Sequence, residues 1–152
     1  MLKPDTIVVG VDHSACSRQA LAWAVAEAQR SSRPLLLVHV WHWGGDAIVS
    51  PLAPANLPEH GEAGRALLRR CAADIRAQGV EVSTKLLEGP AASALVDAAQ
   101  GAAMLVVGSH GRNTFANALM GSVSKACVHR SACPVVVVPV HLAEDSAAAA
   151  AR

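Results

Sequence analysis

Short runs of aliphatic residues, separated by stretches with helical periodicity, constrain this chain more than any other feature. Such runs occupy residues 6–11, 34–41, 104–107 and 134–140. A short run that is apolar at nearly every position suits a strand buried on both faces of a sheet. Residues 80–86 instead alternate apolar and polar side chains, which is typical of a half-exposed strand at a sheet edge. The sequence therefore predicts five strands.

The segments between these strands carry the pattern of amphipathic helices. Apolar residues recur at helical spacing over 20–28, 67–75 and 91–99, and a fourth helix is expected over 122–131. Each helical crossover returns the chain in the same direction, so strands and helices in alternation produce a mostly parallel sheet with helices on both faces. The predicted fold class is therefore α/β, a three-layer sandwich around a five-stranded, mostly parallel sheet.

Composition narrows the classes of function. The 152 residues include 13 Lys and Arg against 12 Asp and Glu, a net charge of +1, and only 3% are aromatic. Neither a basic surface nor a stacking platform for nucleic acid is therefore expected. The hydrophobic content suffices for one domain, predicted over 1–142, with a frayed alanine-rich tail over 143–152. No leader or membrane-spanning run is found, which predicts a cytoplasmic protein without a membrane partner.

The sequence does not indicate a metal-only or redox site. The four cysteines, Cys16, Cys71, Cys127 and Cys133, contain no CxxC pair, so we interpret them as small buried hydrophobic residues. No set of His, Cys and Asp has ligand spacing. His110 lies where a general acid could act, but no orienting carboxylate neighbours it in the sequence, so we expect it to pack or to cap.

Glycines and hydroxyl residues after the fourth strand point to an anion site. Gly108 and Gly111 flank a turn directly behind this strand, and Gly121 and Ser122 begin the next helix. Glycine lets backbone N–H groups approach a phosphate, and a helix N-terminus adds unpaired donors and a partial positive charge. The hydroxyls of Ser122 and Ser124 could donate to the same oxygens. The alternative is that the glycines only turn the chain and that Ser122 only caps the helix.

A second polar turn follows the first strand. Asp12 stands at the carboxyl end of this strand, where its carboxylate could meet a ribose hydroxyl, a base edge or a metal ion. Its alternative role is to cap a turn or the following helix, and Ser14 and Ser17 are candidates for that helix cap. Neither GxxxxGK[ST] nor GxGxxG occurs in the chain, so the predicted anion site is of another kind.

The glycine spacing G-x2-G-x9-G-S over residues 108–122 makes the chain similar to a known family. Together with VVGVDHS at 8–14 and CPVVVV at 133–138, it resembles the universal stress protein family, and in particular the ATP-binding branch of that family. The resemblance extends over residues 5–140, nearly the whole chain.

This resemblance implies a topology and a ligand. It implies the strand order 3-2-1-4-5 of flavodoxin-like and adenine nucleotide alpha hydrolase-like folds, with ATP in the crevice between strands one and four. Asp12, with Gly10 and Val11, would flank adenine and ribose, and the backbone of Val40 would meet adenine. The positions matched to ribose and phosphates are Gly108, Gly111, Gly121, Ser122, Val123 and Ser124. Whether magnesium or manganese accompanies the nucleotide stays open.

The chain departs from the family pattern after the first strand. Related sequences often carry glycine behind the strand-one aspartate, whereas this chain has His13. A non-glycine residue is uncommon in a left-handed turn. A departure is therefore expected on the adenine side of the site, while the phosphate side is unaffected.

The fifth strand carries four consecutive valines between Pro134 and Pro139. An apolar edge strand tends to pair with another chain, and prolines limit open-ended pairing. The sequence and the resemblance therefore predict a symmetric homodimer through this strand, from Val135 to Val140. The alternative is that a helix covers it.

The resulting hypothesis is an ATP-binding stress-response regulatory protein that acts as a nucleotide-dependent dimeric sensor, with at most slow hydrolysis. The donor-rich loop lacks an evident general base, and Asp12 is the one carboxylate placed for magnesium. Two alternatives stay open: a dimeric adaptor of the same fold that binds no nucleotide, and a slow ATPase or adenylyl-transfer enzyme. The sequence identifies neither the physiological trigger nor the downstream partner.

Overall fold

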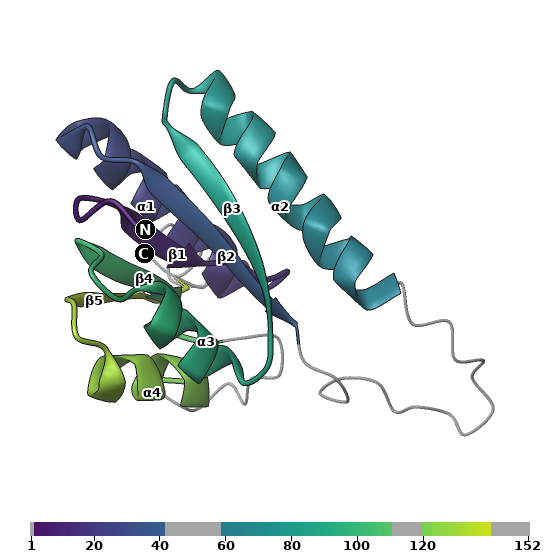
Figure 1. Cartoon of the computed structure of the whole chain (residues 1–152), viewed down its shortest axis with the longest axis vertical. Helices are drawn as coiled ribbons and strands as arrows, with labels where there is room; N and C mark the ends of the chain where they lie inside the picture. The colour runs from purple at the N-terminus through teal and green to yellow at the C-terminus, as the bar shows by residue number, and fades with distance from the viewer. Residues whose placement is uncertain (1, 42–58, 111–119, 141–152) are drawn as a thin grey trace, which may run out of the picture.

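A computed structural model of the chain describes residues 2–41, 59–110 and 120–140. Within these residues, five strands alternate with four helices (Figure 1). The strands are β1 (Ile7–Gly10), β2 (Leu35–Trp41), β3 (Val82–Glu88), β4 (Met104–Gly108) and β5 (Val135–Val138). The helices are α1 (Ala15–Ser31), α2 (Glu59–Ala77), α3 (Ala91–Ala98) and α4 (Ser122–Arg130).

The five strands form one sheet in the order β3-β2-β1-β4-β5, and every pair of neighbours is parallel. This result confirms the predicted fold class and strand order, and it places the alternating strand β3 at an edge. The chain runs outward from β1 through β2 to β3 and then crosses to β4 on the other side of β1. The boundary between β1 and β4 is therefore the point at which strand order reverses, where open α/β sheets bind ligands.

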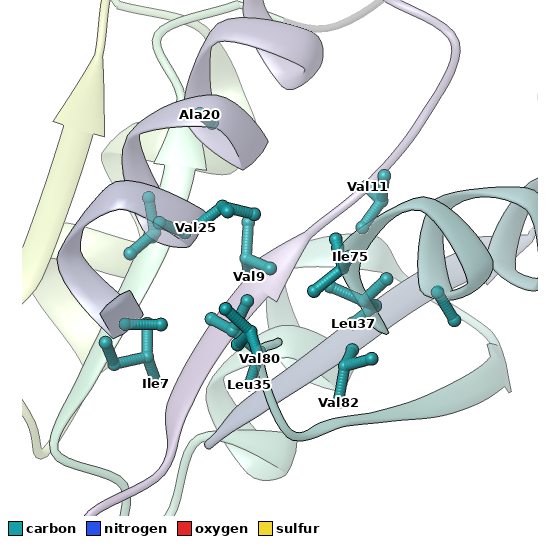
Figure 2. Close-up of a cluster of buried hydrophobic side chains, with 14 of the residues drawn as sticks. Ile7, Val9, Val11, Ala20, Val25, Leu35, Leu37, Ile75, Val80 and Val82 are labelled. Atoms are coloured by element: carbon teal, nitrogen blue, oxygen red, sulfur yellow. The ribbon is translucent and has the colours of Figure 1, made fainter. Parts of the chain in front are cut away.

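Two apolar clusters, one on each face of the sheet, hold the layers together. In β1, the side chains of Ile7 and Val9 belong to one cluster and that of Val8 to the other, and all three are fully buried. Figure 2 shows the first cluster, in which Val9 lies between α1 and α2 with Val25 and other aliphatic side chains. The second cluster joins the sheet to α3 and α4. Burial on both faces explains why β1 is apolar at nearly every position.

The fifth strand is shorter than the sequence predicts. The expected strand covered 134–140, whereas β5 spans Val135–Val138. Its partner β4 ends at Gly108, which pairs with Val138, so no ladder continues beyond this position. The predicted tail over 143–152 lies outside the described residues.

The cysteines differ in burial. Cys16 and Cys127 are buried as predicted, but Cys71 and Cys133 are only partly buried because they lie at the margins of the two clusters. Burial raises the pKa of the Cys127 thiol to about 11. In the part of the chain that the structure describes, no helix is both long and apolar enough to cross a membrane.

Candidate functional site

A cavity of about 340 Å³ opens at the carboxyl ends of β1 and β4. Every predicted site residue that the structure describes lines it, while Gly111 lies outside the described residues. The lining residues are Gly10, Val11, Asp12, Ser14, Ser17, Val38, Val40, Ala91, Leu95, Val107, Gly108, His110, Gly121, Ser122, Val123 and Ser124. Residues far apart in the sequence thus meet where the strand order reverses.

The start of α1 is closed by a reciprocal set of hydrogen bonds. Ser14 is the N-cap, and its hydroxyl accepts from the backbone N–H of Ser17 at 3.1 Å. The Ser17 hydroxyl in turn accepts from the N–H of Asp12 at 2.7 Å. Asp12 Oδ1 accepts from the N–H of Ser14 at 2.7 Å. Asp12 therefore does cap the turn, but this uses one carboxylate oxygen, and a carboxylate accepts at both.

His13 does not adopt a left-handed conformation. Among the described residues, Ser32 is the one non-glycine residue with a positive φ, at 54°. The turn between β1 and α1 is built without left-handed backbone, so His13 does not replace a glycine that the backbone requires. The His13 carbonyl instead accepts from Arg18 at 3.0 Å.

The start of α4 lacks a side-chain cap. Gly121 is its N-cap, and among the residues that the structure describes no side chain caps the first turn. The first N–H groups of a helix, here those of Ser122, Val123 and Ser124, have no partner within the helix and carry its partial positive charge. All three residues line the cavity. This helix end therefore offers donors to an anion.

The hydroxyls of the two predicted serines differ in their contacts. The Ser124 hydroxyl donates to the carbonyl oxygens of Ser109 and Gly121, at 2.9 and 3.0 Å, and Ser124 is buried. It therefore serves the structure of the turn and not, as the sequence suggested, a ligand. Ser122 is exposed and lines the cavity, so its hydroxyl is placed to contact a bound molecule.

Part of the cavity lining is apolar and includes a helix that the sequence analysis did not assign to the site. Val38, Val40, Val107 and Leu95 line it, and Leu95 belongs to α3. A Cβ atom at Gly10 would lie 3.2 Å from both methyl groups of Leu95, so the glycine lets α3 approach β1 closely. The sequence signal was present in the breakers between β3 and α3, which start this helix at the same edge of the sheet.

Close packing against α1, and not the expected access of a phosphate to the backbone, explains why position 108 is glycine. A Cβ atom there would lie 2.7 Å from Cys16 Cβ and 2.8 Å from the Cys16 carbonyl carbon. The backbone of β4 therefore touches α1, and this packing excludes a side chain. At Gly121 a Cβ atom would lie 3.3 Å from the Ser109 carbonyl oxygen, a tight but milder contact.

His110 lines the cavity and is anchored by its neighbour. Its Nδ1 lies 3.0 Å from the Ser109 hydroxyl, which lies 3.5 Å from Cys16 Sγ. Asp12 and His110 are the titratable residues that line the cavity within the described part of the chain. The bond to Ser109 agrees with the expectation that His110 packs or caps, and the residue also belongs to the cavity lining.

His39 supports the cavity from β2. Its Nδ1 lies 2.7 Å from the carbonyl oxygen of Val11, a cavity residue. On its other side a Cβ atom at Gly64 of α2 would lie only 2.6 Å from His39 Cδ2, so the helix rests against the ring. Among the residues described, no cluster of three or more His, Cys, Asp or Glu could hold a metal ion.

Comparisons with known proteins agree on one family. Residues 4–139 match the model of the universal stress protein family. A universal stress protein of Mycolicibacterium smegmatis is 37% identical over 134 residues, which cover 87% of this chain and 45% of the relative. The chain thus spans about half the length of the curated relatives it matches.

Solved structures share the fold. The universal stress protein of Archaeoglobus fulgidus has a TM-score of 0.71 at 25% identity, covering 88% of this chain and 98% of that chain. A universal stress protein solved in complex with cAMP has a TM-score of 0.67 at 28% identity, covering 89% of this chain and 96% of that one.

Proposed function

This chain belongs to the universal stress protein family, and we propose that its cavity binds adenine nucleotides, with ATP as the physiological ligand. The observation that carries the proposal is the uncapped N-terminus of α4, which opens onto a cavity at the reversal point of the sheet. A helix start of this kind binds phosphate through backbone N–H groups. The cAMP complex of a related protein supports the same class of ligand.

The proposed pose follows the chemistry of the walls. The base lies on the apolar side formed by Val38, Val40 and Leu95, and Asp12 accepts from the ribose. The phosphates lie at the start of α4. The residues proposed to contact the nucleotide are Gly10, Val11, Asp12, Val40, Gly108, Gly111, Gly121, Ser122, Val123 and Ser124. Ser124 would contribute its backbone N–H and not its hydroxyl.

A magnesium or manganese ion would fit this site only as a companion of the phosphates. Asp12 is the one carboxylate among the described lining residues, and Mg²⁺ is often held by one or two carboxylates together with phosphate oxygens. Such an ion would neutralise phosphate charge. With a single carboxylate already bonded to the turn, the described cavity favours a nucleotide-dependent regulator over a fast phosphatase, with at most slow hydrolysis.

We further propose that the regulator is a homodimer joined through β5. All four β5 valines are partly exposed, and beside them lies an exposed aromatic side chain, Trp23 of α1, at 39% exposure. Gln19, Ala22 and Trp23 line a groove with Val136, Val137, Val138 and Pro139. A second copy that pairs along this edge would cover the groove. The proposed interface therefore includes residues of α1 in addition to the predicted stretch from Val135 to Val140. Size-exclusion chromatography with light scattering tests the dimer. A monomer at micromolar protein concentration would contradict it.

Mass spectrometry of the small molecules that copurify with the protein, followed by calorimetric titration with ATP, tests the nucleotide proposal. Recovery of an adenine nucleotide and saturable heat are expected. Absence of both heat and thermal shift at millimolar ATP would favour the adaptor without nucleotide. Steady product formation that Asp12→Ala abolishes would favour the ATPase or adenylyl-transfer enzyme. A cytoplasmic location, and the lack of nucleic-acid and membrane partners, stay predictions from the sequence.

A further inference from the structure

The backbone of Val40 extends past the end of the neighbouring strand β1. The Val38 carbonyl accepts from the N–H of Val11 at 2.8 Å, so it faces β1. Backbone polar groups point to alternate sides along a strand, and Val40, two residues later, therefore directs its N–H and C=O to the same side. The paired register of β1 and β2 ends at Gly10 and Val38. A donor and an acceptor on one residue thus lie beyond the ladder, on a residue that lines the cavity.

The side chain of His39 occupies the group that would otherwise pair with Val40. If the ladder continued, the Val40 N–H would donate to the Val11 carbonyl. Instead this carbonyl oxygen lies 2.7 Å from His39 Nδ1, and since a carbonyl only accepts, the ring donates from Nδ1. Within residues 2–41, no backbone bond from Val40 to Val11 is found. Val11 is 5% exposed, so its carbonyl requires a partner, and the imidazole supplies it.

Packing on the other edge of the ring keeps the His39 donor in place. A Cβ atom at Gly64 of α2 would lie 2.6 Å from His39 Cδ2, which is on the opposite side of the ring from Nδ1. The helix backbone therefore closes the space into which the ring would move away from Val11. Both the hydrogen bond and this contact hold the imidazole against the end of β1.

On the premise of the proposed function, we infer that His39 is a positioning residue for base recognition. Its ring engages the Val11 carbonyl and thereby leaves the N–H and C=O of Val40 to the Watson–Crick edge of adenine. This edge carries an acceptor, the ring nitrogen N1, beside a donor, the 6-amino group, and so complements an N–H beside a C=O. Hypoxanthine has a 6-oxo group and an N1–H, the reverse pattern, and would leave polar groups unpaired.

The first test is calorimetric titration of wild type and His39→Leu with AMP and with inosine monophosphate (IMP). Wild type should prefer AMP by about tenfold. Leucine fills the space of the ring but donates no hydrogen bond, so the Val40 N–H should turn to the Val11 carbonyl. AMP affinity should then fall about fivefold while IMP affinity changes by less than about twofold, and the preference should largely disappear.

A second measurement does not depend on any nucleotide. Amide hydrogen exchange followed by NMR reports whether a backbone N–H is bonded. In nucleotide-free wild type, the Val40 amide should exchange faster than that of Val38, which lies within the β1–β2 register. In His39→Leu the Val40 amide should become protected, because it continues the ladder. Addition of AMP to wild type should protect it as well.

A conservative variant and a matched control separate positioning from a general structural role. The amide nitrogen of His39→Asn is as many bonds from the main chain as Nδ1, so this variant should restore most of the preference for AMP. His129→Leu makes the same change as His39→Leu on the exposed last turn of α4, away from the cavity. It should retain wild-type affinities for both nucleotides. Thermal unfolding of each variant verifies that it folds.

The outcomes distinguish this inference from the proposed function. If wild type binds AMP and His39→Leu keeps the full preference over IMP, the role of His39 is refuted while nucleotide binding stands. A slowly exchanging Val40 amide in nucleotide-free wild type would also refute it, even if His39→Leu does not fold. If wild type binds neither AMP nor ATP, the proposed function fails, and base recognition by Val40 fails with it.

Discussion

Two helices, α1 and α4, begin behind the adjacent strands β1 and β4, yet their N-termini are completed in different ways. At α1, Ser14 caps the first turn, and Asp12 and Ser17 close the bonds around it. At α4, the N-cap is Gly121, which has no side chain to contribute. Two equivalent positions in the topology therefore differ: the start of α1 is capped by side chains, and the start of α4 is not.

The two helix starts therefore divide stability from binding within one fold. Backbone N–H groups that bond to a cap stabilise the folded chain, by about 1 kcal/mol of unfolding free energy for a typical N-cap. Donors left open are available to a ligand and stabilise the protein only when it is bound. Substitutions near α1 should therefore act on the unfolding free energy, and substitutions at the exposed start of α4 should act on affinity. Four variants test this division.

Gly108→Ala should have the largest effect, because the new methyl group would overlap the backbone of Cys16 at 2.8 Å. Overpacking of this kind costs about 1–3 kcal/mol, and urea unfolding monitored by circular dichroism would measure it. Gly121→Ala is the matched control at α4, where the nearest atom is 3.3 Å away, and its loss of stability should be smaller. Equal losses in the two variants would contradict the packing argument.

Ser14→Ala should lower the unfolding free energy by about 1 kcal/mol, because the N–H of Ser17 loses its acceptor. Ser14→Asp supplies a carboxylate oxygen at the same place and should recover most of that loss. Chemical denaturation of the three proteins would measure both changes. Wild-type stability in Ser14→Ala would mean that the cap contributes nothing.

Ser122→Ala should weaken AMP binding about fivefold, the equivalent of about 1 kcal/mol for one hydrogen bond. Its thermal midpoint without nucleotide should stay unchanged, because Ser122 is exposed at the start of the helix. Titration calorimetry and a thermal scan give the two values. A lowered midpoint with normal affinity would reverse the assignment of α4 as the open end.

Ser124→Ala should show the opposite behaviour, and the smallest change. Its hydroxyl is bonded to the Ser109 and Gly121 carbonyls, so about 0.5–1 kcal/mol of stability should be lost. AMP affinity should remain within about twofold of wild type, since the backbone N–H is retained. A larger loss of affinity than that of Ser122→Ala would place the hydroxyl on the ligand after all.

The sequence was sufficient for the fold because the side-chain patterns of β1 and β3 match their environments, whereas the uninterrupted valines of β5 do not indicate its place at an edge. Ile7, Val8 and Val9 are apolar since both faces of β1 are covered, and the alternation in 80–86 marks an edge. The positions of Asp12 and Gly121 at strand and helix ends also follow from such patterns, and the structure brings them to one cavity.

The parts that sequence analysis missed depend on contacts between distant segments. Leu95 joins the cavity only because Gly10 lets α3 approach. Cys16, which lies 92 positions earlier in the chain, leaves no room for a side chain at position 108. The Ser124 hydroxyl is already engaged by Ser109. None of these pairings has a local pattern, because each arises from the tertiary packing of helices on the sheet.

The His39 ring has a mechanical consequence. It touches α2 at Gly64 on one side and the carbonyl of Val11 on the other, and Val11 is further tied to Val38 through a backbone bond of 2.8 Å. A shift of α2 would thus be transmitted through one rigid imidazole to the floor beneath a ligand. Through this ring, α2 is mechanically connected to a cavity that it does not itself line.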